Sequence, residues 1–317
     1  MHSGVVTTMA SLWSIGKLGW LGLAKRVWHE IQEDDVFGRA AQLSYYFLLA
    51  LFPFLIFLTS IIGLVLGSGT GTRHALFNYL ARVMPPSAYQ LISSTVTEVS
   101  ASSSGGKISF GILAALWAAS NGMTAITSSL NSAYDLEETR PWWKQRLTSI
   151  VLTMALSVLI ISALVLVVAG GHIADWLALT FGLGDTFPLI WKIIQWPVVL
   201  ACMTFAFALI YYFAPDVREQ KWKWLTPGAV IGVVLWLLVS LAFRVYLHFF
   251  NSYSATYGSL GAVIILMLWL YLTGAAVLIG GETNSEIENI AAEQGQPEAK
   301  EKGEKAPQEK KGAKQAA

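Results

Sequence analysis

The chain has 317 residues, of which 55% are hydrophobic and only 13% are charged, and its formal net charge is +1. A soluble domain carries about 25% charged residues, so this composition argues against a soluble enzyme or binding module. The small net charge gives no reason to expect nucleic acid or an acidic protein as a partner. We therefore expect one integral membrane domain rather than several soluble ones.

Residues 1–38 form a leader that precedes the first apolar stretch. Apolar side chains of this leader fall on one face of a helix, and most of its charged side chains fall on the opposite face. The apolar face consists of Trp20, Leu23, Ala24, Val27, Trp28 and Ile31. This pattern predicts an amphipathic helix, which either lies in the lipid headgroup region or covers the cytoplasmic end of the protein's own bundle.

Six apolar stretches follow the leader, each long enough to cross a bilayer as a helix. They are residues 41–66, 108–130, 148–169, 190–213, 228–250 and 260–280. A hydrocarbon core about 30 Å thick needs about 20 apolar residues in helical form, and backbone groups in lipid must be satisfied within the segment. The sequence thus predicts an all-α polytopic membrane protein, with a six-helix transmembrane bundle over residues 39–288.

The segments outside the membrane differ in charge and in expected order. Lys and Arg are concentrated in the leader and in the second and fourth loops, which predicts that both termini are cytoplasmic. The long first outer loop is expected to contain two short helices, 73–84 and 87–100, and to act as a cap over a cavity or as a spacer. Residues 289–317 have the composition of a disordered, charged cytoplasmic tail.

Polar side chains recur at three- and four-residue spacing within the second apolar stretch and form a polar stripe along one side of it. The polar stripe consists of Trp117, Ser120, Asn121, Thr124, Ser128 and Asn131. Polar groups inside a membrane tend to face the bundle interior or a water-filled cavity, so the stripe is a candidate lining for a hydrophilic path. The alternative is that these side chains hydrogen-bond between helices and hold them together.

Three ionisable residues and two prolines are further candidates. Arg244 lies in the outer half of the fifth stretch, where it could bind an anionic group or extend to the outer interface. Arg39 and Glu282 lie at similar depth near the cytoplasmic side and could form an ion pair. Pro53 and Pro197 fall inside apolar stretches, and an interior proline bends a helix, so they are candidate hinges or simple packing bends.

Signatures of soluble enzymes are missing from the sequence. It has no GxxxxGK[ST] phosphate-binding loop, its five histidines lack metal-binding spacing, and Cys202 is its single cysteine. We therefore expect no enzymatic activity, no catalytic residue, no bound metal and no cofactor.

Several motifs, in order, resemble those of the YihY/BrkB family over about residues 25–288. They are AAQLSYYF at 40–47 with LFP at 51–53, WAAS at 117–120, NSAY at 131–134, ETRP at 138–141, YFAP at 212–215, WLTPGA at 224–229, YGSLG at 257–261 and GE at 281–282. The resemblance implies a six-span protein of the bacterial inner membrane. Members have been labelled virulence factor, for serum resistance, and ribonuclease BN. The nuclease label fits this sequence poorly, because it offers no metal-ligand set or acid–base pair for cleaving RNA.

The function we expect is that of a transporter or flippase-like protein for a small or lipid-like solute. The alternative, from another class, is a scaffold or envelope-integrity protein that transports nothing. The expected partners are membrane lipids and such a solute, with a second copy of the chain left open and nucleic acid not expected. Water accessibility along the second apolar stretch separates the two functions, because only a transporter needs a wetted face that includes Asn121 and Thr124.

Overall fold

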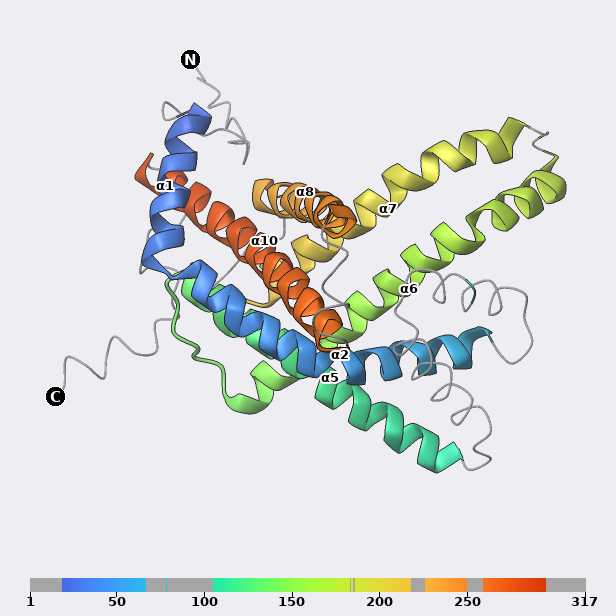
Figure 1. The fold of residues 1–317 in the computed structure, drawn as a ribbon, viewed down its shortest axis with the longest axis horizontal. Coiled ribbons are helices and arrows are strands. Elements are labelled where there is room, and N and C mark those ends of the chain that lie inside the picture. Colours follow the sequence, from blue (N-terminus) through green and yellow to red (C-terminus); the bar gives the residue numbers. More distant parts are fainter. Residues whose placement is uncertain are drawn as a thin grey trace, which may run out of the picture. The chain divides into compact units, whose positions relative to one another are not determined.

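The computed structural model describes residues 19–66, 78, 105–182, 184, 186–217, 226–249 and 259–294. Every regular element in these ranges is a helix, and they contain no strand (Figure 1). The helices are α1 (Gly19–Glu33), α2 (Val36–Leu66), α5 (Gly105–Ala133), α6 (Trp142–Phe181), α7 (Thr186–Phe213), α8 (Pro227–Phe249) and α10 (Ser259–Glu293). The predicted all-α class is confirmed.

Five of these helices contain stretches long and apolar enough to cross a membrane. The stretches are Val36–Leu58, Trp142–Val167, Thr186–Phe213, Pro227–Tyr246 and Val263–Glu293. The remaining predicted stretch, 108–130, lies in α5, whose 29 residues extend about 43 Å at about 1.5 Å per residue. Its Gly, Ser, Thr and Asn residues make α5 the least apolar of the long helices, and it is not among the five. The chain is a polytopic helical membrane protein.

Several predicted boundaries differ from those of the structure. α6 begins before residue 148 and continues past 169, because a helix can extend beyond the hydrocarbon core that limits its apolar segment. α10 runs to Glu293, so the first residues assigned to a disordered tail are helical, and Ile290 is buried. Apart from the single helical residue Asn78, the helices predicted at 73–84 and 87–100 lie outside the described residues, as does the tail after 294.

Short-range hydrogen bonds define several helix ends. At the start of α2, the Asp35 side chain accepts a hydrogen bond from the Gly38 amide, as expected of an N-terminal cap. After α5, Asp135 takes a left-handed conformation with φ of 54°, and the amide of Leu136 donates to the carbonyl of Asn131. This geometry closes the helix and turns the chain into segment 134–140.

The chain folds into two compact units. The first unit comprises Met1–Ser44, Thr127–Arg140 and Tyr211–Ala317, and the second comprises Tyr45–Ile126 and Pro141–Ile210. In the first unit, α10 packs against α8 and α1. An added Cβ at Gly228 or Gly280 would overlap backbone or side-chain atoms of the facing segments, so glycine permits the close approach of α8 and α10. The Tyr211 hydroxyl adds a 2.7 Å hydrogen bond to the carbonyl of Val277.

The predicted amphipathic helix is present as α1. Its residues Leu23, Val27 and Ile31 are buried, and α1 contacts α10, which supports the interpretation that this helix covers part of the protein's own bundle. Trp20 and Trp28, assigned to the same apolar face, are 55% and 59% exposed. α1 therefore has a buried apolar edge and an exposed aromatic edge.

The second unit is held by contacts between neighbouring helices. Phe57 of α2 and Leu116 of α5 belong to one buried cluster, against which Ile150 of α6 packs. Gly170 of α6 lies close to Trp191 and Gln195 of α7, which places these two helices in contact. The contact between Ile150 and the cluster that contains Leu116 holds α6 beside α5, and the polar groups described below lie between these two helices.

Candidate functional site

The structure divides the polar stripe of α5 along its width. The exposed members on the isolated chain are Trp117, Asn121 and Ser128, the buried ones are Ser120 and Asn131, and Thr124 is intermediate. Ser120 and Thr124 donate hydrogen bonds to backbone carbonyls one turn earlier on α5. The stripe therefore has one edge directed into the protein and one edge directed away from it.

Two residues on the exposed edge of the stripe, Trp117 and Asn121, bind Arg146 of the second unit. It lies one turn after the start of α6 at Trp142 and is only 8% exposed. Its Nη1 donates a 2.7 Å hydrogen bond to Oδ1 of Asn121, and its Nη2 donates to the carbonyl of Trp117. The guanidinium carbon lies 4.1 Å from the centre of the Trp117 ring, within the range of a cation–π interaction.

The positive charge of Arg146 has no acidic partner among the described residues. Its two hydrogen-bond acceptors are neutral, and its buried Nε has no hydrogen-bond partner in that part of the chain. The one described acidic residue of the second unit is Asp175, which lies about 43 Å further along α6 at about 1.5 Å per residue. Burying a charge without a counter-ion is energetically unfavourable.

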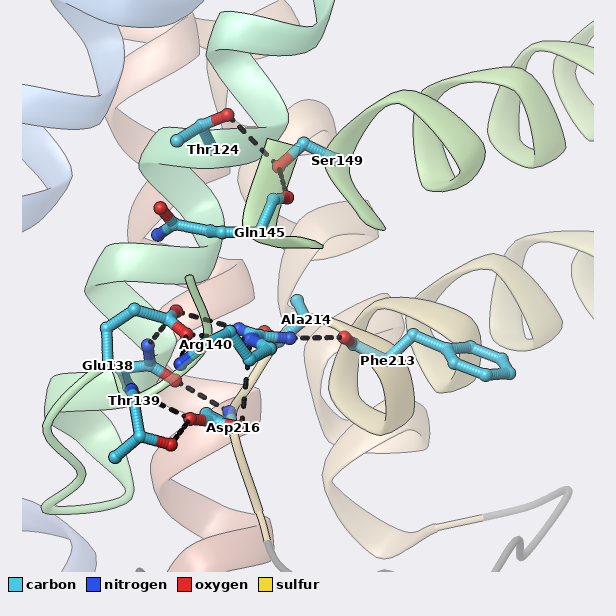
Figure 2. Close-up of polar contacts among 10 residues, drawn as sticks. Thr124, Glu138, Thr139, Arg140, Gln145, Ser149, Phe213, Ala214 and Asp216 are labelled. Carbon is cyan, nitrogen blue, oxygen red and sulfur yellow. Dashed lines mark hydrogen bonds and ion pairs between the residues drawn. The ribbon is translucent and has the colours of Figure 1, made fainter. Parts of the chain in front are cut away.

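Two more polar side chains connect α5 and α6 within the second unit (Figure 2). The hydroxyls of Thr124 and Ser149 share a hydrogen bond at 3.0 Å, and Oγ of Ser149 is also hydrogen-bonded to the carbonyl of Gln145. These contacts fix the relative rotation of α5 and α6 one turn from Arg146. They also show that part of the polar stripe forms interhelical hydrogen bonds, as the structural interpretation of the stripe requires.

Arg140 in the first unit forms a different kind of arrangement (Figure 2). Its guanidinium binds both carboxylate oxygens of Glu138, at 2.7 and 2.8 Å, and donates to the carbonyl of Ala214 at 2.8 Å. Asp216 lies 3.7 Å from the same group and accepts hydrogen bonds from the amide and hydroxyl of Thr139. Asn131 completes the network by donating to Glu138 and accepting from the Asp216 amide.

The charges of this network compensate one another. Burial lowers the pKa of Arg140, but the hydrogen bonds and negative charge of Glu138, with a contribution from Asp216, outweigh it and raise that pKa. Arg140 therefore stays charged and joins segment 134–140 to the segment that follows α7. We interpret this network as a structural joint of the first unit.

The other candidate ionic residues are not brought together. Arg39 donates a 2.8 Å hydrogen bond to the carbonyl of Asp34, and no ion pair joins it to Glu282 within the described ranges. Glu282 is 1% exposed and has Asp34 and Glu30 as acidic neighbours. Arg244 is exposed on α8.

The two candidate hinges lie inside continuous helices. Pro53 is within α2 and Pro197 is within α7. Neither proline ends its helix, so any hinge motion would be a bend of an intact element.

Sequence reasoning missed Arg146, because it was counted with Arg140 and Lys144 as a charge of the second loop. The sequence does carry a signal for it. Arg146 lies only two residues before the apolar stretch at 148–169, and Trp142 and Trp143 precede it as interfacial aromatics do. Its binding to Asn121 could not be inferred, since that contact depends on how α5 packs against α6.

The fold and the site define a polytopic helical membrane protein with a buried arginine, at one end of a spanning helix, that has no acidic partner within the described ranges. The chain belongs to the virulence factor BrkB family, whose sequence model matches residues 27–304. The predicted resemblance is thereby confirmed.

Individual relatives agree with this membership. The chain is 41% identical over 248 residues, 78% of this chain and 88% of the relative, to Bacillus subtilis YfkH, whose name only likens it to a ribonuclease. It is 33% identical over 106 residues to a UPF0761 membrane protein of Idiomarina loihiensis, covering 33% of this chain and 37% of the relative. A UPF0761 membrane protein of Stenotrophomonas maltophilia is 24% identical over 276 residues, 84% of this chain and 61% of the relative. No solved structure matches the chain.

Proposed function

We propose that this protein transports or flips a small or lipid-like solute, and that the polar stripe of α5 and Arg146 of α6 form the part of the path that contacts the solute. The observation that carries the proposal is the position of Arg146. A charged group on a membrane-spanning helix is rare and marks a substrate or ion path more often than a packing site. Here it is bound by two residues of the stripe, Trp117 and Asn121.

The charge pattern supports a specific orientation for this function. The positive-inside rule favours cytoplasmic termini, which would place the Trp142 end of α6 at the inner face of a bacterial inner membrane. Arg146 would then lie at the depth where a solute enters from the cytoplasm or leaves toward it. No enzymatic step is part of the proposal.

The first test is the water accessibility of α5. Single cysteines are introduced at Asn121, Thr124 and Leu113 in a background where Cys202 is replaced by alanine, and intact vesicles are treated with a membrane-impermeant thiol reagent from each side. We expect labelling at positions 121 and 124 from at least one side. Leu113 is the matched control, because it is 63% exposed on the isolated chain but apolar, and a lipid-facing cysteine there stays unlabelled.

Protection of positions 121 and 124 to the same extent as position 113 would contradict a path along α5. The function itself is tested by reconstituting the protein in vesicles with fluorescent phospholipid in the inner leaflet. Appearance of that lipid in the outer leaflet, accelerated by the protein and slowed by Asn121→Leu, is the expected result. Equal rates with and without protein would count against lipid flipping.

One observation favours the second candidate function, a scaffold that transports nothing. Ser120, Thr124 and Asn131 already have hydrogen-bond partners within the chain, as expected if the stripe only holds helices together. The accessibility experiment separates the two functions, because a scaffold would leave position 121 dry.

A further inference from the structure

We propose that Arg146 is the binding residue for the phosphate of an anionic lipid headgroup. This inference rests on the proposed function, since it names the charge class of the solute at the same site, but it is tested by binding and not by transport. It starts from a comparison of the arginines that the structure describes.

Arg146 differs from Arg26 and Arg140, the arginines for which ion pairs are described, because no carboxylate among the described residues lies next to its charge. Arg140 binds Glu138 and lies near Asp216, and Arg26 binds Glu286 and Glu293. Arg146 is the one arginine in the buried class among the described residues, and both of its acceptors are uncharged. The most buried of the described arginines is therefore one for which the described chain supplies no counter-ion.

The chemistry of the guanidinium selects the class of anion. Its planar fork binds two oxygens of one phosphate or carboxylate group, and such charge-assisted hydrogen bonds are about twice as strong as those to neutral acceptors. Nη1 and Nη2 now bind neutral oxygens of Asn121 and Trp117. Two phosphate oxygens can replace these two acceptors one for one. The phosphate then supplies the negative charge that the site lacks, and no further hydrogen-bond donor is needed.

The surroundings of Arg146 match the interfacial depth at which lipid phosphates lie. Trp142 and Trp143 are 69% and 56% exposed, and Lys144 lies over the Trp143 ring at 5.4 Å. Exposed tryptophan next to lysine is typical of the membrane–water interface. The Trp117 ring, 48% exposed and 6.2 Å from the Trp142 ring, lies against the guanidinium.

These observations favour a lipid over a free anion. A soluble phosphate would have to reach a guanidinium covered by the Trp117 ring, whereas a lipid phosphate is delivered at this depth by its own acyl chains. The aromatic edge formed by Trp117 and Trp142 is the surface along which those chains would lie.

The test measures binding of short-chain phosphatidylglycerol and phosphatidylcholine to the full-length protein by native mass spectrometry in neutral detergent. We expect preferential binding of phosphatidylglycerol and a loss of about tenfold or more in its affinity for Arg146→Gln, as for the loss of a charged hydrogen-bond partner. Lys144→Gln is the matched control: it removes the same charge two residues away, from an exposed side chain. An equal loss in both variants would overturn the proposal, because it would show attraction by surface charge only.

A second variant pair keeps the test valid if Arg146→Gln folds poorly. Asn121→Asp places a carboxylate of nearly the same shape where Arg146 already donates its 2.7 Å hydrogen bond. This internal counter-ion should abolish the preference for phosphatidylglycerol while it raises thermal stability. Gln32→Glu, which adds a carboxylate at an exposed position of α1 outside the stripe, is the control and should change neither property. Retained lipid preference in Asn121→Asp would overturn the proposal.

Two further outcomes separate this inference from the proposed function. Binding that depends on Arg146 without any protein-accelerated flipping would support the lipid site and contradict the transport function. Flipping that is unaffected by Arg146→Gln would support transport and contradict the site. Inorganic phosphate that displaces phosphatidylglycerol at equal affinity would overturn the assignment to a lipid.

Discussion

Replacing Arg140 by alanine is expected to destabilise the first unit substantially. The substitution removes three hydrogen bonds of 2.7 to 2.8 Å, to the two oxygens of Glu138 and the carbonyl of Ala214. It leaves two carboxylates, of Glu138 and Asp216, at 23% and 13% side-chain exposure without their cation. Removing one partner of a buried ion pair costs about 3–5 kcal/mol, and the partial exposure here favours about 3 kcal/mol.

The assay is thermal unfolding of the purified protein in detergent, followed by the loss of monomer on size-exclusion chromatography. At about 2 °C per kcal/mol for a chain of this size, the midpoint should fall by about 6 °C. Lys144→Ala, an exposed cation near the same segment, should shift it by less than about 1 °C. Adding Glu138→Gln to Arg140→Ala should recover part of the loss, because it removes one uncompensated charge. A midpoint for Arg140→Ala no lower than that of Lys144→Ala would refute the reasoning.

Four other substitutions have defined expected effects. Gly280→Ala should destabilise the protein by about 1–3 kcal/mol, because the added Cβ would overlap the Tyr211 hydroxyl of α7 and the Gly228 carbonyl of α8. Gly171→Ala, in a helical position with nothing within 4 Å, should be neutral or stabilising by up to about 1 kcal/mol, and thermal midpoints compare the two. Tyr211→Phe should cost about 1 kcal/mol in the same assay by removing the hydrogen bond that the buried Tyr211 hydroxyl donates to the Val277 carbonyl. Arg26→Ala should speed hydrogen exchange in α1, because it removes the ion pairs of that helix. It should lower the thermal midpoint by less than about 2 °C, since the Arg26 side chain is 36% exposed. Unchanged exchange would show that these ion pairs do not hold α1.

Hydropathy predicted the helices well because it reports the one property that the membrane imposes on them. It did not predict their ends, since a helix continues beyond the hydrocarbon core wherever its backbone bonds and caps permit. α6 shows this most clearly: its apolar part was predicted at 148–169, and the helix extends from Trp142 to Phe181. The residues gained at its start include Arg146, which was therefore assigned to a loop.

The polar contacts required information that one sequence does not state directly. Arg140 bridges Glu138 with Ala214, and Asn131 bridges Glu138 with Asp216, across 85 residues in the longest case. Periodicity identified Asn131 as a member of the polar stripe, but it could not show that this side chain binds Glu138 and the Asp216 amide instead of lining a hydrophilic path. The motifs that carry the family resemblance contained a better signal, because NSAY, ETRP and YFAP supply Asn131, Glu138, Thr139, Arg140 and Ala214.

Charge compensation is the physical criterion that separates Arg140, which we interpret as structural, from Arg146, for which we propose a binding role. In the first unit, Arg140 is surrounded by carboxylates, so its removal should cost stability and leave ligand affinity unaffected where the fold survives. In the second unit, Arg146 is held by neutral groups, so adding a carboxylate at Asn121 should improve stability and remove a binding site. At a site that serves packing alone, a substitution that stabilises the protein has no ligand binding to abolish. Opposite changes of stability and lipid affinity in Asn121→Asp are therefore the result that a functional site at Arg146 requires.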